Sequence, residues 1–262
     1  MSSPSGHFGR GRTSTLFMAN TAVQTGAAPA PKGLVARFIG VIAEPRATFE
    51  SVAAHPKWLG MLALTTAIVL VCTVLPMTTE GGKEAMLETQ VRQMESFGVQ
   101  VNDQMYQQMR SRMGIAPYTT AGGVLVMSPI ITAALAGILL VIFGAIMGGS
   151  ATFKQVYAIV VHAGVISALG QLITGPLNYF RGTMASATNL SVLLPMLPEG
   201  TFLTRLAGMI DLFIIWWVFI LAVGVAVLYK RRTQSVAMTL FGIYAAIALV
   251  AATVMNVLGG RH

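Results

Sequence analysis

Eighteen consecutive residues without a charge, from Leu212 to Tyr229, are the feature that most restricts what this chain can fold into. At a rise of about 1.5 Å per residue they form a helix of roughly 27 Å, close to the hydrocarbon thickness of a bilayer. Lys230, Arg231 and Arg232 follow the run directly. The positive-inside rule places such a block on the cytoplasmic side of a membrane. We therefore expect this segment to span a bilayer, with the three basic residues as topology anchors.

The composition of the whole chain indicates the same class. Of 262 residues, 55% are hydrophobic and only 10% are charged, with a mean hydropathy of +0.71, which excludes an ordinary water-soluble domain. The net charge of +8 would suggest a nucleic-acid partner in a soluble chain, but topology explains it better here, and no nucleic-acid partner is predicted. The single Cys72 excludes a disulfide framework within the chain.

These patterns predict an all-α integral membrane protein with five transmembrane helices. Residues 1–32 are rich in Ser, Gly, Ala, Thr and Pro and are expected to be a disordered cytoplasmic tail. Methionines and other apolar residues recur at helical spacing in the polar segment 78–118, which predicts a helical hairpin packed on the outer face. The five-span domain covers 58–258, and its expected spans are 58–77, 120–148, 156–175, 207–229 and 236–258.

Two short amphipathic helices are expected before the first span, in residues 33–57. Apolar residues, Phe38 among them, share one face of the first helix, and Pro45 suits the first position of the second, where Phe49 lies on the apolar side. Arg46 and Lys57 flank these faces. We expect the pair to lie on the cytoplasmic membrane surface, with these five residues contacting lipid or a partner.

The distribution of charge predicts the orientation. When the chain is threaded through five spans, ten of the 17 Lys and Arg residues fall on the side of the membrane that holds the amino terminus. Only Glu44 and Glu50 of the nine acidic residues fall on that side. On the opposite side of the membrane, the numbers of basic and acidic residues are almost equal. The amino terminus is therefore expected in the cytoplasm and the carboxyl terminus outside.

Three segments carry a resemblance to a known family. They are RFIGVIAEPRATFESVA before the first span, ATFKQVYAIVVHAG entering the third, and IDLFIIWWVFILAVGVAVLYK in the fourth. In this order they resemble the Yip domain family of Ypt/Rab-interacting polytopic membrane proteins, in its bacterial form, over roughly residues 34 to 258. The resemblance implies five spans with a cytoplasmic amino terminus. In eukaryotes, proteins of this family act in vesicle trafficking by binding Rab-type GTPases and one another, whereas the bacterial members have no settled biochemical role.

Asp211, Arg205 and His162 are the candidate functional polar residues within the membrane region. A carboxylate there is costly and often functional, but Asp211 could equally cap a helix that starts beside it or pair with Arg205. His162 could relay a proton, or it could form a hydrogen bond between helices.

A stripe of methionines offers a weak metal-site hypothesis. Met105, Met109 and Met113 recur every four residues and could present thioethers to Cu(I). The same spacing is typical of the buried face of an amphipathic helix, which is the interpretation we favour. No cofactor is predicted.

Small residues mark the expected packing faces of the spans. Gly144 and Gly148 form a GxxxG pair, and Gly164 and Gly170 reduce the side-chain bulk of the third span. Such residues let helix backbones approach closely in lipid.

Catalytic motifs are not evident: the sequence contains no Gly-rich phosphate loop, nucleophile with a base, or metal quartet. The main hypothesis is a non-enzymatic protein of the bacterial inner membrane that organises the membrane or binds a protein partner or another copy of itself. The rival hypothesis is a transporter or permease component for a small solute, protons or copper.

Overall fold

The computed structural model describes residues 33–181, 186–194, 196–198 and 201–259. The predicted tail, 1–32, lies outside the described residues. Apart from an isolated bridge between Asn189 and Asp211, the regular structure of the described residues is helical. The helices are α1 Leu34–Ala43, α2 Pro45–Ala54, α3 Leu59–Met77, α4 Glu80–Ser96, α5 Asp103–Arg112, α6 Ala116–Leu139, the π-helix η1 Leu140–Ile146, α7 Phe153–Phe180, α8 Leu190–Leu193, α9 Phe202–Met209, α10 Leu212–Leu228 and α11 Thr233–Gly259.

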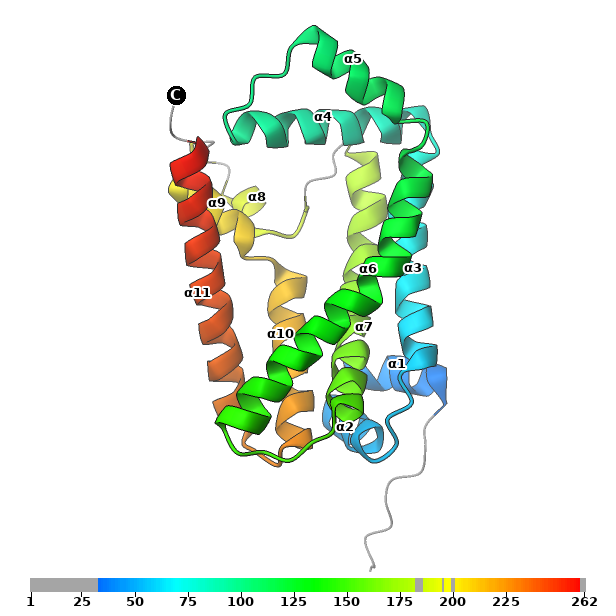
Figure 1. The fold of residues 1–262 in the computed structure, drawn as a ribbon, viewed down its shortest axis with the longest axis vertical. Helices are drawn as coiled ribbons and strands as arrows, with labels where there is room; N and C mark the ends of the chain where they lie inside the picture. Colours follow the sequence, from blue (N-terminus) through cyan, green and yellow to red (C-terminus); the bar gives the residue numbers. More distant parts are fainter. Residues whose placement is uncertain (1–32, 182–185, 195, 199–200, 260–262) are drawn as a thin grey trace, which may run out of the picture.

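The long apolar helices α3, α6, α7, α10 and α11 form a bundle (Figure 1). Helices α1 and α2 lie at one end of this bundle, and α4 and α5 lie across the other. We call these the α1–α2 end and the α4–α5 end. The described chain begins at the first and finishes at the second. The predicted fold class, an all-α membrane protein with a helix pair at one end and a helical hairpin at the other, is confirmed.

Helix α7 is the centre of the bundle. Within its most apolar window 67% of the residues are buried, compared with 17% in α3, 11% in α6 with η1, and 17% in α11. The outward surfaces of these three helices are apolar instead, with Leu75, Ile131 and Val250 each more than 60% exposed. Such a surface is stable in lipid, where backbone groups must be paired internally but apolar side chains need no cover.

Within the described residues, four helices are long and apolar enough to cross a membrane: Leu59–Met77, Ala116–Ile146, Phe153–Phe180 and Thr233–Val257. They correspond to four of the five expected spans. The fifth, α10, has 17 residues, or roughly 26 Å of helix. The predicted count of five is therefore not confirmed by length.

The expected span 207–229 starts too early. Helix α9 ends at Met209, and Ile210 and Asp211 adopt extended backbone conformations before α10 begins at Leu212. Hydropathy does not detect this break, because Ala207, Gly208 and Met209 at the end of α9 are small or apolar like residues of a span. The side chain of Asp211 stops the helix from extending backward by accepting hydrogen bonds from the free amide groups of its first turn.

The hairpin at the α4–α5 end is held by a small apolar cluster. Leu87 of α4 packs with Met113 and Ala116, with Met86 and Met109 alongside. Met109 and Met113 thus contribute to packing between α4 and the end of α5, which agrees with the favoured interpretation for these two of the three methionines. On the surface of α4, Lys83 donates a hydrogen bond to Glu80, and this contact lowers the pKa of that carboxyl.

Candidate functional site

Helix α2 packs into the bundle at the α1–α2 end. Its Phe49, Val52, Thr48 and Ser51 are at most 2% exposed. The Phe49 ring fills the space left by Gly224 of α10: a Cβ atom at Gly224 would lie 3.1 Å from the ring and 2.6 Å from Ile159 of α7. Three elements that are distant in the sequence therefore meet at a position where only glycine fits.

This packing changes the interpretation of the predicted surface residues. Phe49 is fully buried, so its assignment to a partner or membrane surface was wrong. Phe38 is partly buried against the core, and Pro45 is the first residue of α2. Arg46 and Lys57 are exposed, as expected for surface residues. The apolar face of α2 contacts protein rather than lipid.

Arg37 of α1 connects this helix pair to the central helix. Its Nη1 donates to the Lys57 carbonyl at 2.7 Å and lies 3.2 Å from Nε2 of His162, which is fully buried in α7. Arg37 was not among the predicted site residues. It falls three residues after Leu34 and four before Val41, on the core-facing side of α1, and an arginine on such a face signals a buried polar partner.

The contacts of His162 define its tautomer. Nδ1 lies 2.7 Å from the Ala158 carbonyl, which can only accept, so Nδ1 carries the hydrogen. Arg37 can only donate, so Nε2 must be an unprotonated acceptor. Burial lowers the pKa of the Arg37 guanidinium, but arginine stays charged at every pH at which the protein is folded. His162 is therefore neutral and acts as a hydrogen-bonding link between helices, the second of the two interpretations given above.

The start of α7 is tied to the end of α2. Thr152 and Gln155 form a reciprocal capping box at the first turn of α7. The side-chain amide of Gln155 also donates to the Ala53 carbonyl at 3.1 Å. Beside it, the rings of Trp58 and Tyr157 meet edge to face with centroids 5.0 Å apart. Polar and aromatic contacts thus fix both ends of the helix pair.

Asp211 is the N-cap of α10 and is 7% exposed. One carboxylate oxygen accepts from the Phe213 and Ile214 amides at 2.8 and 3.3 Å, and the other accepts from the hydroxyls of Ser186 and Thr188 at 2.6 and 2.7 Å. With these four hydrogen bonds, Asp211 acts as a structural cap of α10.

Asp211 and His162 do not share a site. Asp211 precedes α10 on the side of the α4–α5 end, whereas His162 lies in the half of α7 next to α1. Arg205 of α9 donates to the Met255 carbonyl of α11 at 2.6 Å. The three candidate polar residues therefore connect different pairs of elements, and the described contacts do not place them along one polar path.

The predicted packing glycines have different roles. Gly170 packs closely, because a Cβ there would lie 2.9 Å from the Phe213 ring. Gly148 follows the end of the π-helix with a φ of +71°, so it makes a turn and does not form a GxxxG face. A Cβ at Gly144 would meet only ordinary contacts, and one at Gly164 would meet nothing within 4 Å.

The predicted topology anchors lie between α10 and α11, at the α1–α2 end. Lys230 adopts a positive φ of 52°, and Arg231 donates a hydrogen bond to the Met147 carbonyl. All three basic residues are exposed. They therefore share an end with the exposed Arg46 and Lys57.

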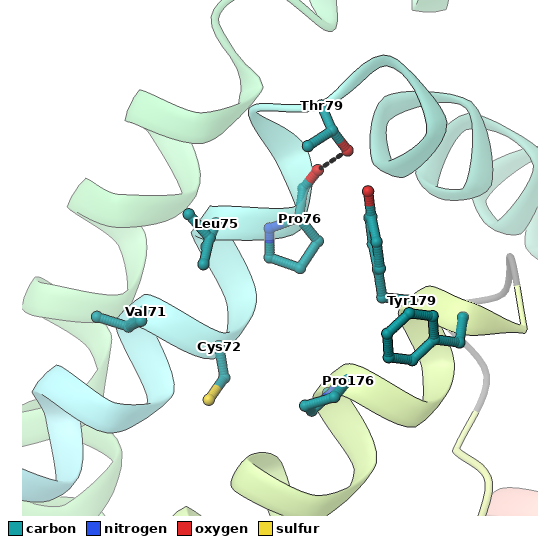
Figure 2. Close-up of a pocket in the computed structure, with 9 residues that line it drawn as sticks. Val71, Cys72, Leu75, Pro76, Thr79, Pro176 and Tyr179 are labelled. Carbon is teal, nitrogen blue, oxygen red and sulfur yellow. Dashed lines mark hydrogen bonds between the residues drawn. The ribbon is translucent and has the colours of Figure 1, made fainter.

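At the opposite end, a cavity of about 380 Å³ lies between α3 and α7 (Figure 2). Pro76 and Pro176 face it from the two helices, and Thr79 at its rim donates to the Pro76 carbonyl at 2.8 Å. The Cys72 side chain also points into it. The described lining residues carry no charge, so the cavity suits an apolar chain and not an ion.

Among the described residues, no group of three or more His, Cys, Asp or Glu side chains is placed to hold a metal.

A comparison with protein-family models decides the family. The Yip1 domain model matches residues 39–255, most of the chain. The chain belongs to the Yip1 domain family. Comparisons with curated proteins and with solved structures gave no match.

The three segments that carry the Yip resemblance are those that meet in the structure. The first forms α1 and α2, the second opens α7, and the third forms α10. Phe49, Ile159 and Gly224, one residue from each, meet in a close contact. The segments that carry the resemblance of this Yip1-domain chain therefore pack together at the α1–α2 end.

Substitution of Gly224 tests this packing. Because a Cβ at Gly224 overlaps Ile159 and presses on Phe49, Gly224→Ala is expected to destabilise the protein. Gly242→Ala is the matched control, since a Cβ at that α11 position meets nothing within 4 Å. We expect the unfolding free energies of the two variants to differ by about 2 kcal/mol in mild detergent. Equal stabilities would contradict the contact.

A double-mutant cycle tests the link between Arg37 and His162. Arg37→Gln and His162→Phe each remove a charge-assisted hydrogen bond, and we expect a coupling free energy of about 2 kcal/mol from their unfolding. Arg46→Gln with Glu50→Gln is the control, because that exposed pair, 3.4 Å apart, should couple by less than about 0.5 kcal/mol. Additive effects of Arg37→Gln and His162→Phe would show that the link contributes nothing.

Proposed function

We propose that this Yip1-domain protein is a non-enzymatic interaction scaffold of the bacterial inner membrane, with the α1–α2 end in the cytoplasm. The spans hold the α1–α2 pair in a fixed position, and the exposed face of α2 recruits a cytoplasmic protein. The observation that carries the proposal is the burial of the whole apolar face of α2 against α7 and α10. A helix held in this way presents its polar face in one orientation.

The exposed face of α2 supports recruitment of protein. Arg46, Ala47, Glu50 and Ala54 are all exposed, and they present both signs of charge beside small apolar side chains. A purely lipid-binding helix would instead turn an apolar face outward and carry mainly basic residues on the other. This mixed surface favours a protein partner.

Helix α1 supports placement of this end at a membrane interface. Its inner face packs on the core, whereas Val35 and Ile39 on its outer face are 67% and 57% exposed. Two apolar side chains one turn apart suit the boundary between headgroups and acyl chains. Helix α1 would then lie in the interface while α2 faces the aqueous side.

The charges near this end support a cytoplasmic location. Lys57, Lys154, Lys230 and Arg232 are exposed on connections or helix starts at the α1–α2 end. Basic residues this close to spans are retained on the cytoplasmic side during insertion. Helix α10, although short, would then cross the membrane, with α8 and α9 completing the layer at its far end.

Cysteine accessibility tests the orientation. In a Cys72→Ala background, Ala47→Cys on α2 and Gln107→Cys on α5 place single thiols at exposed positions of the two ends. In intact bacterial spheroplasts, we expect a membrane-impermeant maleimide to label position 107 and to reach position 47 only after permeabilisation. The reverse pattern would place the α1–α2 end outside and overturn the proposed recruitment of a cytoplasmic partner.

Site-specific photo-crosslinking tests the recruitment. We expect a photoreactive amino acid at Ala47 or Ala54 to give a discrete protein adduct in native membranes, and the same group at Gln107 of α5 not to give it. Glu50→Lys should reduce the adduct at Ala54, because reversing one charge in a mixed-charge surface disfavours the cognate partner. The absence of any adduct at both α2 positions would count against the proposal.

A further inference from the structure

Two cavities adjoin on one side of α7. The first, of about 280 Å³, lies between α7 and the start of α10, next to Asp211. The second, of about 250 Å³, lies between α3, α6, α7 and α10. Ser167 and Trp217 line both. The two cavities are therefore neighbours, and together we call them the α7 groove, which leads from the level of Asp211 toward the middle of the bundle.

Polar groups line this groove at the depth of the hydrocarbon. Helix α7 is about 42 Å long, and Ser167 lies about 21 Å from its start at Phe153, near the middle of a hydrocarbon layer about 30 Å thick. Gln171 lies one turn further on. Both residues are exposed.

Three of these groups are available to a ligand. Within the described part of the chain, the side chains of Ser167, Gln171 and Trp217 make no hydrogen bond with another residue. Unpaired donors and acceptors in hydrocarbon are costly. A ligand that hydrogen-bonds to them would remove this cost.

Further hydroxyls line the part of the groove near the middle of the bundle. Thr66 and Ser128 lie with their hydroxyl oxygens 3.2 Å apart, and Thr65 and Thr132 donate to carbonyls of their own helices. Each of these oxygens still has accepting capacity. Between them lie apolar side chains such as Val69, Ile131 and Leu135. This part of the groove suits an apolar chain with occasional polar contacts.

The charges of the groove exclude ionic ligands. None of the described lining residues is Lys, Arg or His, so an anionic headgroup would find no counter-charge. Asp211 is the one ionisable group among them, and its carboxylate already accepts four hydrogen bonds. A cation would therefore have to break existing bonds to reach it. The ligand that fits is uncharged.

We propose that the α7 groove binds a neutral amphiphile of the acylglycerol class. Its hydroxyl or ester group bonds to Gln171 and Ser167 near the cavity beside Asp211, and its chain lies along Val69 and Leu135 toward the middle of the membrane. This assignment rests on the groove alone and is independent of the proposed recruitment by α2.

Photolabelling in liposomes tests the assignment. The probe is a monoacylglycerol with a diazirine in its chain, and the comparison is a phosphatidic acid carrying the same chain. We expect the first to form adducts on α6 and α7 residues of the groove, mapped by mass spectrometry, and excess unlabelled monoacylglycerol to displace it. The phosphatidic acid is expected to label the groove about tenfold less, because its charge is uncompensated there.

Two variants examine the groove by different physical means. Gln171→Leu removes a hydrogen-bonding group and is expected to reduce groove labelling about tenfold. Gly164→Leu adds bulk to the cavity and removes no polar group, since a Cβ at Gly164 meets nothing within 4 Å, and it should reduce labelling similarly. Thr253→Val is the control, because Thr253 is an exposed α11 residue whose hydroxyl donates to its own helix. Labelling is compared only between variants that are as monodisperse as the unmodified protein and share its melting temperature.

Four outcomes would overturn the proposal. The first is equal labelling of the groove by the phosphatidic acid. The second is labelling spread evenly over the lipid-facing surfaces of α3 and α11, and the third is unchanged labelling in both groove variants. The fourth is efficient disulfide crosslinking between two copies carrying Ser167→Cys in the Cys72→Ala background, which would show that a second copy occupies the groove.

Discussion

The packing of Phe49 against Gly224 is the contact on which the α1–α2 end of this protein depends. A ring from α2 enters a space that exists because α10 has no side chain at that position, and Ile159 of α7 closes it. Arg37 and Gln155 then fix the two ends of the helix pair by hydrogen bonds to His162 and to the Ala53 carbonyl. Helix α7 becomes the buried centre because α2, α3, α6 and α10 all pack on it, which leaves α3, α6 and α11 with outward faces that contact lipid.

Polar residues in the bundle differ in how well they are satisfied, and this difference separates structural from ligand-binding roles. Asp211 accepts four hydrogen bonds, and His162 uses both ring nitrogens. In contrast, Ser167 and Gln171 face an open groove without a partner among the described residues. A charged residue in the membrane region, such as Asp211, can therefore be structural. The uncharged Ser167 and Gln171 give the stronger indication of a ligand.

Sequence reasoning predicted those features that depend on the bilayer or on local chemistry. The long apolar runs and the hairpin 78–118 follow from hydropathy and helical spacing, and the chemistry of helix ends gave the cap as one of the alternatives for Asp211. It missed features that depend on which distant segments meet. Phe49 was assigned to a surface because an amphipathic face can turn either to lipid or to protein, and the pairing of Arg37 with His162 joins residues 125 positions apart. The spacing of Gly144 and Gly148 was misleading because the helix ends before Gly148.

Hydrogen–deuterium exchange in lipid nanodiscs tests most directly whether α2 is an integral part of the bundle. The buried position of Thr48 and Val52 predicts that the amides between them exchange as slowly as those of the central helix α7, and far more slowly than those of the exposed α5. Exchange of the α2 amides as fast as that of α5 would show a loosely attached surface helix and would contradict the account.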